Sequence, residues 1–280
     1  MAGGGAAGLS LAYYLGDSSL ADKRILIIDK DRKEQNDRTW CFWTDGPMGL
    51  DEIIHRSWPR VRFTSRYCDL DIDLSPFRYC MIRGIDFYRH VSERFSESTT
   101  TEVRTELVTA IEDGEEAATV RTEGGTFTAD YVFDSIFIPE EFSVDRSRYH
   151  FLFQHFRGWF IETETDVFDP GAATMFDFRV LGGDGMRFMY ILPFSPRNGL
   201  VEYTLFSPRL LEEAEYLEGI RKYLDEILGV TSYEILEYEK GVIPMTEQPF
   251  PRQAGKRIMR IGTKAGMVKG STGFAFHRTQ

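Results

Sequence analysis

The first fifteen residues combine a glycine-rich turn with a run of apolar, helix-forming positions. Gly3, Gly5 and Gly8 are spaced G-x-G-x-x-G, and alanine and leucine dominate the residues that follow. This pattern predicts a helix that begins at the glycines and packs closely on a sheet. After a polar spacer, "ILIIDKD" has four consecutive apolar residues, as in a buried parallel strand, and ends in Asp29.

Together these elements predict a dinucleotide-binding unit. In such a unit the pyrophosphate lies at the amino end of the helix, and an acidic residue about twenty positions beyond the glycines binds the adenosine ribose. Asp29 has that position. A glycine-rich linker is the alternative, but the helix and strand follow in the expected order. Because only Met1 and Ala2 precede the glycines, we expect the first strand of the unit to be missing.

The rest of the chain is rich in strand patterns and contains two amphipathic helical patterns. The predicted elements are a half-buried strand within 61–74, a helix at 85–97, a β-meander over 103–134, a long strand at 150–164, strands at 175–180 and 186–207 (the latter with a turn), a helix at 207–229, and a strand, glycine turn and helix start at 256–276.

This order predicts an α/β protein in which a Rossmann-type FAD-binding domain carries an inserted, mixed β-sheet substrate domain. We expect residues 1–60, 78–140 and 241–280 to form the discontinuous FAD-binding domain. Residues 61–77 and 141–240 would form the β-rich substrate domain. The glycine-rich C-terminal segment would place backbone N–H groups near the flavin and the pyrophosphate.

Composition narrows the functional classes. The net charge of −11 argues against nucleic acid as a partner and against general attraction to anionic lipid. No apolar run approaches the ~18 residues that span a bilayer. The three cysteines form no C-x-x-C pair and the five histidines show no metal-ligand spacing, so we expect no disulfide framework and no metal site. A reducing, cytoplasmic location follows.

Six segments, in order, resemble successive motifs of the FAD-dependent lycopene cyclases and together cover essentially the whole chain. They are "NDRTWCFW" (36–43), "FQHFRGWFIE" (153–162), "MFDFR" (175–179), "YILPFSPRNGLVEYTLFS" (190–207), "GVIPMT" (241–246) and "GTKAGMVKGSTGFAFHRTQ" (262–280).

The resemblance, of the lycopene β-cyclase type, implies closure of the linear ψ-ends of lycopene into β-ionone rings. It also implies bound FAD in reduced form, with NADPH as electron source, although the reaction has no net redox change. A bilayer-dwelling polyene substrate implies peripheral attachment to the membrane through an apolar mouth. Family members usually have proline where this chain has Gly270, and they extend further at both ends, so we expect a truncated chain.

The chemistry indicates which side chains carry the reaction. Cyclisation begins when a proton adds to the terminal C=C, which requires a carboxylic acid kept protonated in a dry pocket. Glu202 occupies the position of the glutamate that the family treats as essential, and it shares a strand face with Leu200, Thr204 and Phe206. From spacing alone, a solvent-facing glutamate on an edge strand is the alternative. Asp177 could aid deprotonation or bind backbone groups.

Other candidates have structural alternatives. Arg38, Trp40 and Trp43 could line the flavin or substrate channel, or belong to the core. Gln154 and His155 could position the substrate, or form a core pair. The remaining cofactor candidates are Gly262, Gly266, Lys269, Ser271, Thr272 and Gly273. For Lys269, Ser271 and Thr272 the alternative is ordinary turn chemistry.

Two other functions stay open. A flavin-dependent oxidoreductase of the hydroxylase or prenyl-reductase type shares the fold and the nucleotide motif, and would consume NAD(P)H continuously. An inactive truncated relative would bind no flavin. The sequence leaves β- against ε-ring formation open as well.

Overall fold

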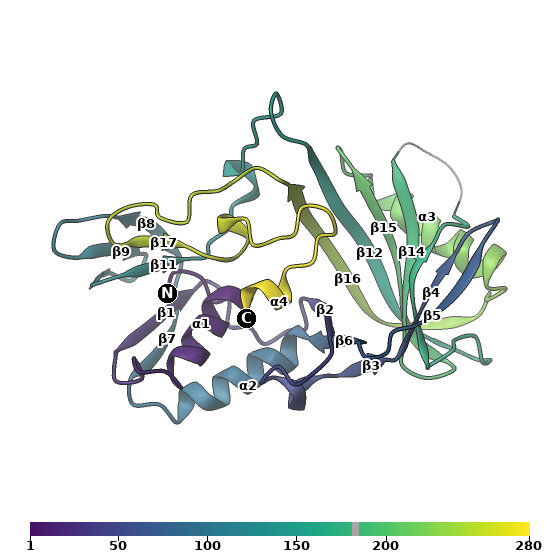
Figure 1. The fold of residues 1–280 in the computed structure, drawn as a ribbon, viewed down its shortest axis with the longest axis horizontal. Helices are drawn as coiled ribbons and strands as arrows, with labels where there is room; N and C mark the ends of the chain where they lie inside the picture. Colours follow the sequence, from purple (N-terminus) through teal and green to yellow (C-terminus); the bar gives the residue numbers. More distant parts are fainter. Residues whose placement is uncertain (181–184) are drawn as a thin grey trace. The chain divides into compact units, whose positions relative to one another are not determined.

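The computed structural model describes residues 1–180 and 185–280, which form two compact units (Figure 1). Unit 1 comprises Met1–Asn36, Gly84–His150 and Thr246–Gln280, and unit 2 comprises Asp37–Arg83 and Phe151–Met245. Each unit therefore combines segments that are far apart in the sequence.

The core of unit 1 is a parallel sheet built around the first residues of the chain. Its strands form two parallel pairs: β1 (Ile25–Asp29) with β7 (Thr101–Thr105), and β11 (Val132–Asp134) with β17 (Ile258–Arg260). Ala2 makes parallel bridges to Ile28 on one side and to Asp134 on the other. The backbone of Met1–Gly3 therefore occupies the place of the strand that the sequence predicted to be missing.

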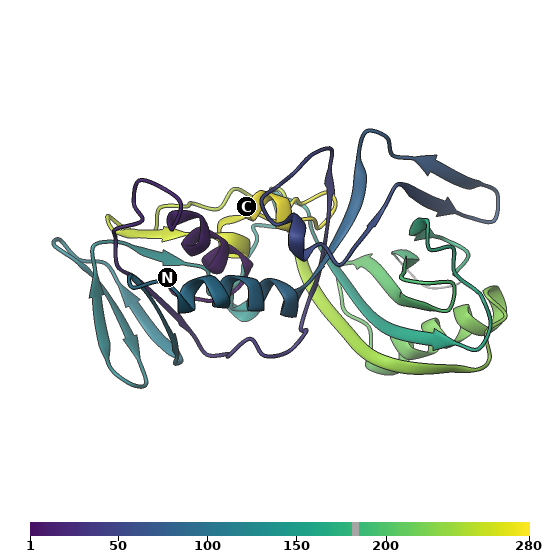
Figure 2. The ribbon, with the colours of Figure 1, turned by 90° about the horizontal axis from the view of Figure 1, so that it is seen from below.

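Two helices of unit 1 lie side by side, as both views show (Figures 1 and 2). Helix α1 (Ala6–Leu15) begins directly after the glycine turn. Helix α2 (Gly84–Ser96) buries Phe87, Val91 and Phe95, as its periodicity predicted.

The predicted meander over 103–134 is shorter in the structure. An antiparallel sheet contains only β8 (Val108–Glu112), β9 (Ala118–Thr122) and β10 (Thr126–Ala129). The flanking strands β7 and β11 pair instead with partners in the parallel sheet, which local pattern alone does not reveal.

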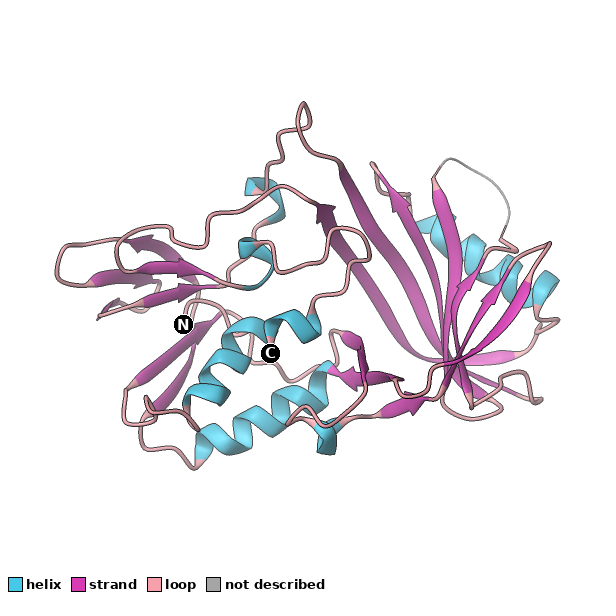
Figure 3. Ribbon diagram, in the orientation of Figure 1, coloured by secondary structure: helices cyan, strands magenta, loops and turns pink. Residues whose placement is uncertain are grey.

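Unit 2 is dominated by a seven-stranded mixed sheet (Figure 3). Its strand order is β16 (Tyr233–Thr246), β12 (Phe151–Thr163), β15 (Asn198–Ser207), β14 (Met186–Pro193), β13 (Ala172–Asp177), β4 (Arg60–Thr64) and β5 (Asp69–Asp73). The single strand predicted within 61–74 is thus a hairpin. Its turn is held by Ser65 Oγ, which accepts hydrogen bonds from the amides of Tyr67 and Cys68.

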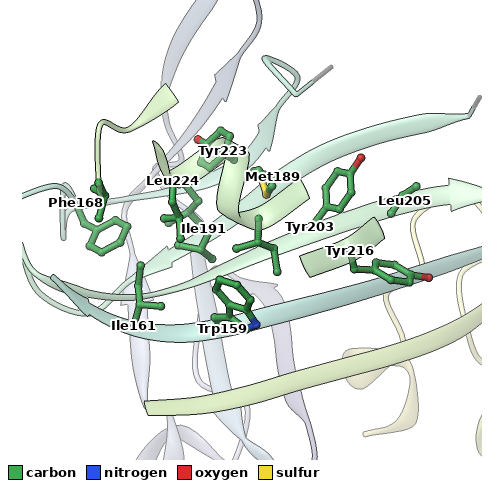
Figure 4. Close-up of a cluster of buried hydrophobic side chains, with 13 residues drawn as sticks. Trp159, Ile161, Phe168, Met189, Ile191, Tyr203, Leu205, Tyr216, Tyr223 and Leu224 are labelled. Carbon is green, nitrogen blue, oxygen red and sulfur yellow. The ribbon is translucent and has the colours of Figure 1, made fainter. Parts of the chain in front are cut away.

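One face of this sheet is covered by α3 (Glu213–Lys222) and the π-helical turn Tyr223–Ile227. The helix begins later than the predicted residue 207 because Glu212 and Glu215 form a capping box at its start. Figure 4 shows the buried cluster between the helical segment and the sheet. The sheet contributes Trp159, Ile161, Met189, Ile191 and Tyr203, and the helical segment contributes Tyr216, Tyr223 and Leu224.

The boundaries of the units differ from the predicted domain boundaries. Residues 37–60 and 78–83 lie in unit 2, because β2 (Thr39–Thr44) and β3 (Arg56–Trp58) both pair with β6 (Arg78–Arg83) in a small antiparallel sheet. Residues 241–245, the end of β16, also lie in unit 2, whereas 141–150 lie in unit 1.

Candidate functional site

Glu202 lies in the middle of the large sheet, on the face opposite α3. Its strand, β15, runs between β12 and β14, so it is not an edge strand. The residues directly across from Glu202 are Gly158 and Tyr190, which therefore share its face. Glu202 is only 6% exposed, and the Thr204 hydroxyl donates a 2.5 Å hydrogen bond to its Oε1. The alternative of a solvent-facing glutamate is wrong.

Two environmental effects favour the protonated form of Glu202. Burial, and secondly the nearby carboxylate of Glu239, raise the pKa of Glu202 well above its ordinary value, while the Thr204 hydrogen bond acts in the opposite direction. A carboxyl group in this position is an acid that keeps its proton until a basic atom is brought to it.

Glu239 on β16 is a site residue that the sequence analysis missed. Its two carboxylate oxygens accept hydrogen bonds from Thr39, one from the backbone N–H at 2.9 Å and one from the hydroxyl at 2.7 Å. Burial raises the pKa of Glu239 to about 7. Charged and apolar side chains alternate along this strand at Glu237, Tyr238 and Glu239, a sequence pattern typical of a strand whose glutamates face solvent. In the structure Tyr238 is the exposed side chain, and both glutamates are half-buried.

Neutral polar groups surround Glu202. The hydroxyls of Tyr79 and Tyr190 lie 2.6 Å apart, and the Trp43 ring lies 4.6 Å from that of Tyr79. Burial raises the pKa of the Cys41 thiol to about 12, so this thiol is uncharged at neutral pH. Of the predicted channel residues, Trp43 therefore packs against Tyr79, one of the side chains around Glu202.

Aromatic rings continue the same face of the sheet away from Glu202. Phe188 is directly opposite Thr204, and its ring centroid is 5.4 Å from that of Phe206. Successive ring contacts at 4.7–5.9 Å extend this aromatic row through Phe63, Phe176, Phe178 and Phe188. The acid therefore lies at one end of an aromatic surface suited to an apolar, unsaturated molecule.

Asp177 does not share this face, and the structure favours the second of its two predicted roles: its Oδ1 accepts a hydrogen bond from the backbone amide of Arg179 at 3.0 Å. Asp177 is paired with Met189, a member of the cluster beneath α3. Its carboxylate accepts a hydrogen bond from the Tyr223 hydroxyl at 2.6 Å and binds the guanidinium of Arg179. Asp177 therefore anchors the helical segment to the sheet.

The predicted pair of Gln154 and His155 divides between the two faces. Gln154 is opposite Phe206 and shares the face of Glu202. His155 lies beneath α3, where its Nδ1 and Nε2 contact the hydroxyls of Tyr216 and Ser207 at 2.5 and 2.8 Å. These contacts favour the alternative prediction for His155, that of a core residue, over a role in positioning the substrate.

Trp40 does not share the face of Trp43, and Arg38 precedes β2. Trp40 alternates with Cys41 and Trp43 along β2 and so faces the other side of the small sheet. The Arg38 side chain is largely exposed and contacts Asp37 in unit 2.

The glycine turn in unit 1 has the geometry that its spacing requires. Gly3 has φ +98°, and a Cβ on Gly8 would overlap the carbonyl oxygen of Gly3. A Cβ on Gly5 would project into open space at the start of α1, where no side chain caps the helix. The amide of Gly4 donates to Asp29 Oδ2 at 2.5 Å, so the predicted ribose ligand also holds the turn. Backbone donors at this helix start can bind a pyrophosphate.

The C-terminal glycine segment contacts the same helix. Gly262 has φ +65°, and a Cβ there would lie 2.9 Å from Cβ of Ala7 in the first turn of α1. Lys264, two residues later, binds Asp134 at the end of β11. Of the predicted cofactor residues in this segment, Gly262 therefore lies directly beside the start of α1.

The remaining predicted residues of this segment form turns. Gly266 adopts φ +70° at the end of a 3-10 turn, and the carbonyl of Lys269 accepts hydrogen bonds from the amides of Thr272 and Gly273. Ser271 is exposed, and α4 (Phe276–Thr279) begins only after this turn.

The structure also explains the glycine at position 270. A Cβ on Gly270 would overlap the carbonyl oxygen of Thr246, so this backbone path has no room for a side chain.

No helix in the described part of the chain is long and apolar enough to cross a bilayer. Within residues 1–180 and 185–280, no group of three or more His, Cys, Asp or Glu side chains could hold a metal ion.

Comparison with known proteins gives one family. The family model described as "Lycopene cyclase protein" matches residues 1–280. A chloroplastic lycopene beta cyclase from an Oncidium hybrid cultivar is 25% identical over 300 residues, which cover 99% of this chain and 60% of that protein. The chain thus spans about 60% of the length of this curated relative.

Solved structures share the fold. A geranylgeranyl bacteriochlorophyll reductase-like protein from Thermoplasma acidophilum is 13% identical with a TM-score of 0.71, covering 99% of this chain and 73% of its own. A probable FAD-dependent monooxygenase from Pseudomonas aeruginosa is 16% identical with a TM-score of 0.68, covering 99% and 81%. These similarities confirm the predicted α/β, Rossmann-type flavoprotein fold.

Proposed function

This chain belongs to the lycopene cyclase family, and we propose that it catalyses the acid-initiated, redox-neutral cyclisation of the ψ-ends of lycopene to β-ionone rings. The observation that supports this reaction most directly is the buried carboxyl of Glu202 at one end of an aromatic surface. An alkene is a very weak base, and only an acid held in its protonated form in a dry site can protonate it.

The reaction balances in protons. Glu202 donates its proton to the terminal double bond and becomes a carboxylate, which leaves a tertiary cation on the substrate. The neighbouring double bond attacks this cation and closes the ring. Loss of one proton from the ring then forms the new double bond, and that proton returns to the protein. The product is an isomer of the substrate.

FAD fits the glycine turn of unit 1. The uncapped start of α1 and the open space at Gly5 would receive the pyrophosphate, Asp29 would accept the ribose hydroxyls, and Gly262 lies beside the same helix start. When bound in its reduced form, with NADPH as electron source, FAD supplies an electron-rich plane or takes part in proton transfer.

Lycopene resides in the bilayer, so we propose peripheral attachment to the membrane through apolar contact. Tyr67, Leu70, Ile72 and Phe77 on and beside the β4–β5 hairpin are large exposed hydrophobic side chains that could make such a contact. Flotation with neutral-lipid vesicles should persist in high salt, because the attraction is not mainly electrostatic. Complete release by salt would oppose this attachment.

Expression in lycopene-accumulating cells, with pigments separated by chromatography, tests the cyclase proposal. Ring-containing products of unchanged mass support it. An altered product mass with continuous NADPH consumption supports a flavin-dependent oxidoreductase instead. Absence of flavin absorbance from the purified protein, together with unchanged lycopene, supports an inactive relative.

A further inference from the structure

We propose that Glu239 is a positioning residue for the proton of Glu202: Thr39 favours the carboxylate form of Glu239, so that of the two carboxyls Glu239 ionises first and Glu202 keeps its proton. The catalytic meaning of this arrangement rests on the proposed cyclase function. The location of the proton does not, and it can be measured without substrate.

The sheet brings the two carboxyl groups into electrostatic contact. Their strands, β15 and β16, are both neighbours of β12, which contributes Gly158 directly opposite Glu202. The His150 amide donates to Glu247, and a Cβ on Gly241 would meet the Phe156 ring, so β12 and β16 run antiparallel with Glu239 beside Gly158. A Cβ on Gly158 would lie 3.3 Å from the Cβ of Glu202, so Gly158 places no side chain between the two glutamates. The negative charge of Glu239 accordingly raises the pKa of Glu202.

The hydrogen bonds decide which glutamate is ionised. Glu239 accepts two hydrogen bonds from Thr39, whereas Glu202 accepts one, from Thr204. Donors directed at a carboxylate stabilise its ionised form. Glu239 therefore loses its proton first, and its charge then opposes ionisation of Glu202.

The other titratable groups near the pair are neutral or already matched to a countercharge. Burial raises the pKa values of Cys41 on β2, Tyr79 on β6 and Tyr190 on β14, so all three stay protonated at neutral pH. On β16 itself, Glu237 is bound by Arg83 at 2.7 Å.

Glu237 and Asp37, which precedes β2, both oppose the ionisation of Glu239. The two donors on Thr39 act against this repulsion.

In the proposed reaction this arrangement keeps the acid loaded. When Glu239 is ionised, the pair holds one proton before the reaction and none after Glu202 has protonated the alkene. Two carboxylates then face the cation and stabilise it. Deprotonation of the ring returns one proton to the pair.

Carbon-13 NMR of isotopically labelled glutamate carboxyls in the 280-residue chain tests the proposal directly. In the wild type, Glu239 should titrate near pH 7 and Glu202 at higher pH. Glu239→Gln removes the negative charge and should increase the acid dissociation constant of Glu202 by about tenfold or more. Glu234→Gln, the same change at an exposed position on the same strand, should leave both titrations unchanged.

Thr39→Val provides a second measurement in case Glu239→Gln does not fold. It removes the hydroxyl donor but keeps the backbone N–H, so the pKa of Glu239 should rise. An unchanged Glu202 titration in Glu239→Gln, or ionisation of Glu202 before Glu239 in the wild type, overturns the inference.

The two proposals fail separately. A protein that makes no rings but shows the NMR coupling contradicts the cyclase proposal and supports the inference about Glu239. In an active protein, Glu239→Gln should lose activity at lower pH than the wild type as pH is raised. If the protein forms rings, and Glu239→Gln changes neither the pH profile of activity nor the titration of Glu202, only the inference about Glu239 is contradicted.

Discussion

The hydroxyl groups of Tyr79 and Tyr190 lie 2.6 Å apart and join the small sheet of unit 2 to the seven-stranded sheet. Tyr79 comes from β6, and Tyr190 comes from β14, directly across from Glu202. This hydrogen bond therefore fixes one side of the space in which the candidate acid lies.

Removal of either hydroxyl should destabilise the protein. Tyr79→Phe leaves the Tyr190 hydroxyl without this partner, which costs about 1–3 kcal/mol of unfolding free energy. The double variant with Tyr190→Phe should cost less than the sum of the single changes, since no unmatched hydroxyl of the pair remains. Urea denaturation measures all three variants. Tyr67→Phe, at a 96% exposed ring, is the control with no expected change, and strict additivity would contradict the pairing.

Long, regular patterns in the sequence predicted their elements well. The 3.6-residue period around Phe87, Val91 and Phe95 located α2, and the strand patterns on either side of the turn "PFSPRNG" located β14 and β15. The hairpin within 61–74 was missed because its turn, Ser65–Cys68, contains neither glycine nor proline and depends on the serine hydroxyl.

The face on which a strand residue lies was harder to predict than the strand itself. The register of β13 shifts between Thr174 and Asp177, and such a bulge changes which side chains face the acid. Glu239 escaped notice for a different reason: the group that marks it, Thr39, is 200 positions away in the sequence. A buried carboxylate partner of this kind is visible only after the strands have paired.

Acidification should destabilise the protein through His155. Burial lowers the pKa of His155 from 6.5 to about 4 in the folded protein. Between these pH values the unfolded chain binds the extra proton, so stability is lost as pH falls from 6.5 towards 4. His155→Gln removes this titration and should show a shallower fall of the urea midpoint over the same range. Equal slopes for the two proteins would argue against a buried, neutral His155.

Gly5→Ala should weaken flavin binding without unfolding the protein. Gly5 has φ −80°, which alanine adopts readily, and the new Cβ would enter open space where the pyrophosphate is proposed to bind. We expect a loss of affinity of about tenfold, or ~1.4 kcal/mol, with an unchanged melting temperature. Flavin fluorescence titration and thermal unfolding measure the two effects.

Two other glycine variants provide comparisons for Gly5→Ala. Gly46→Ala adds a Cβ to open space in unit 2 and should change neither property. Gly8→Ala places a Cβ on the carbonyl oxygen of Gly3 and should lower both stability and affinity. Wild-type flavin affinity in Gly5→Ala would exclude the start of α1 as the pyrophosphate site.

Glu202→Gln is the decisive substitution for the proposed reaction. The amide keeps the volume and can still accept the hydrogen bond from Thr204, but it has no acidic proton, so folding and flavin binding should survive. In a protein that shows cyclase activity, ring formation should fall by at least the ~10² that general acid catalysis contributes. Glu202→Asp should retain a trace, because near-attack geometry is sensitive to displacements of about 1 Å.

Glu213→Gln, which breaks only the exposed contact with Arg157 on the α3 side, should leave the rate nearly unchanged. If flavin-loaded Glu202→Gln formed rings at a near-normal rate, another group would have to donate the proton, and the buried Glu202 carboxyl would not be the catalytic acid.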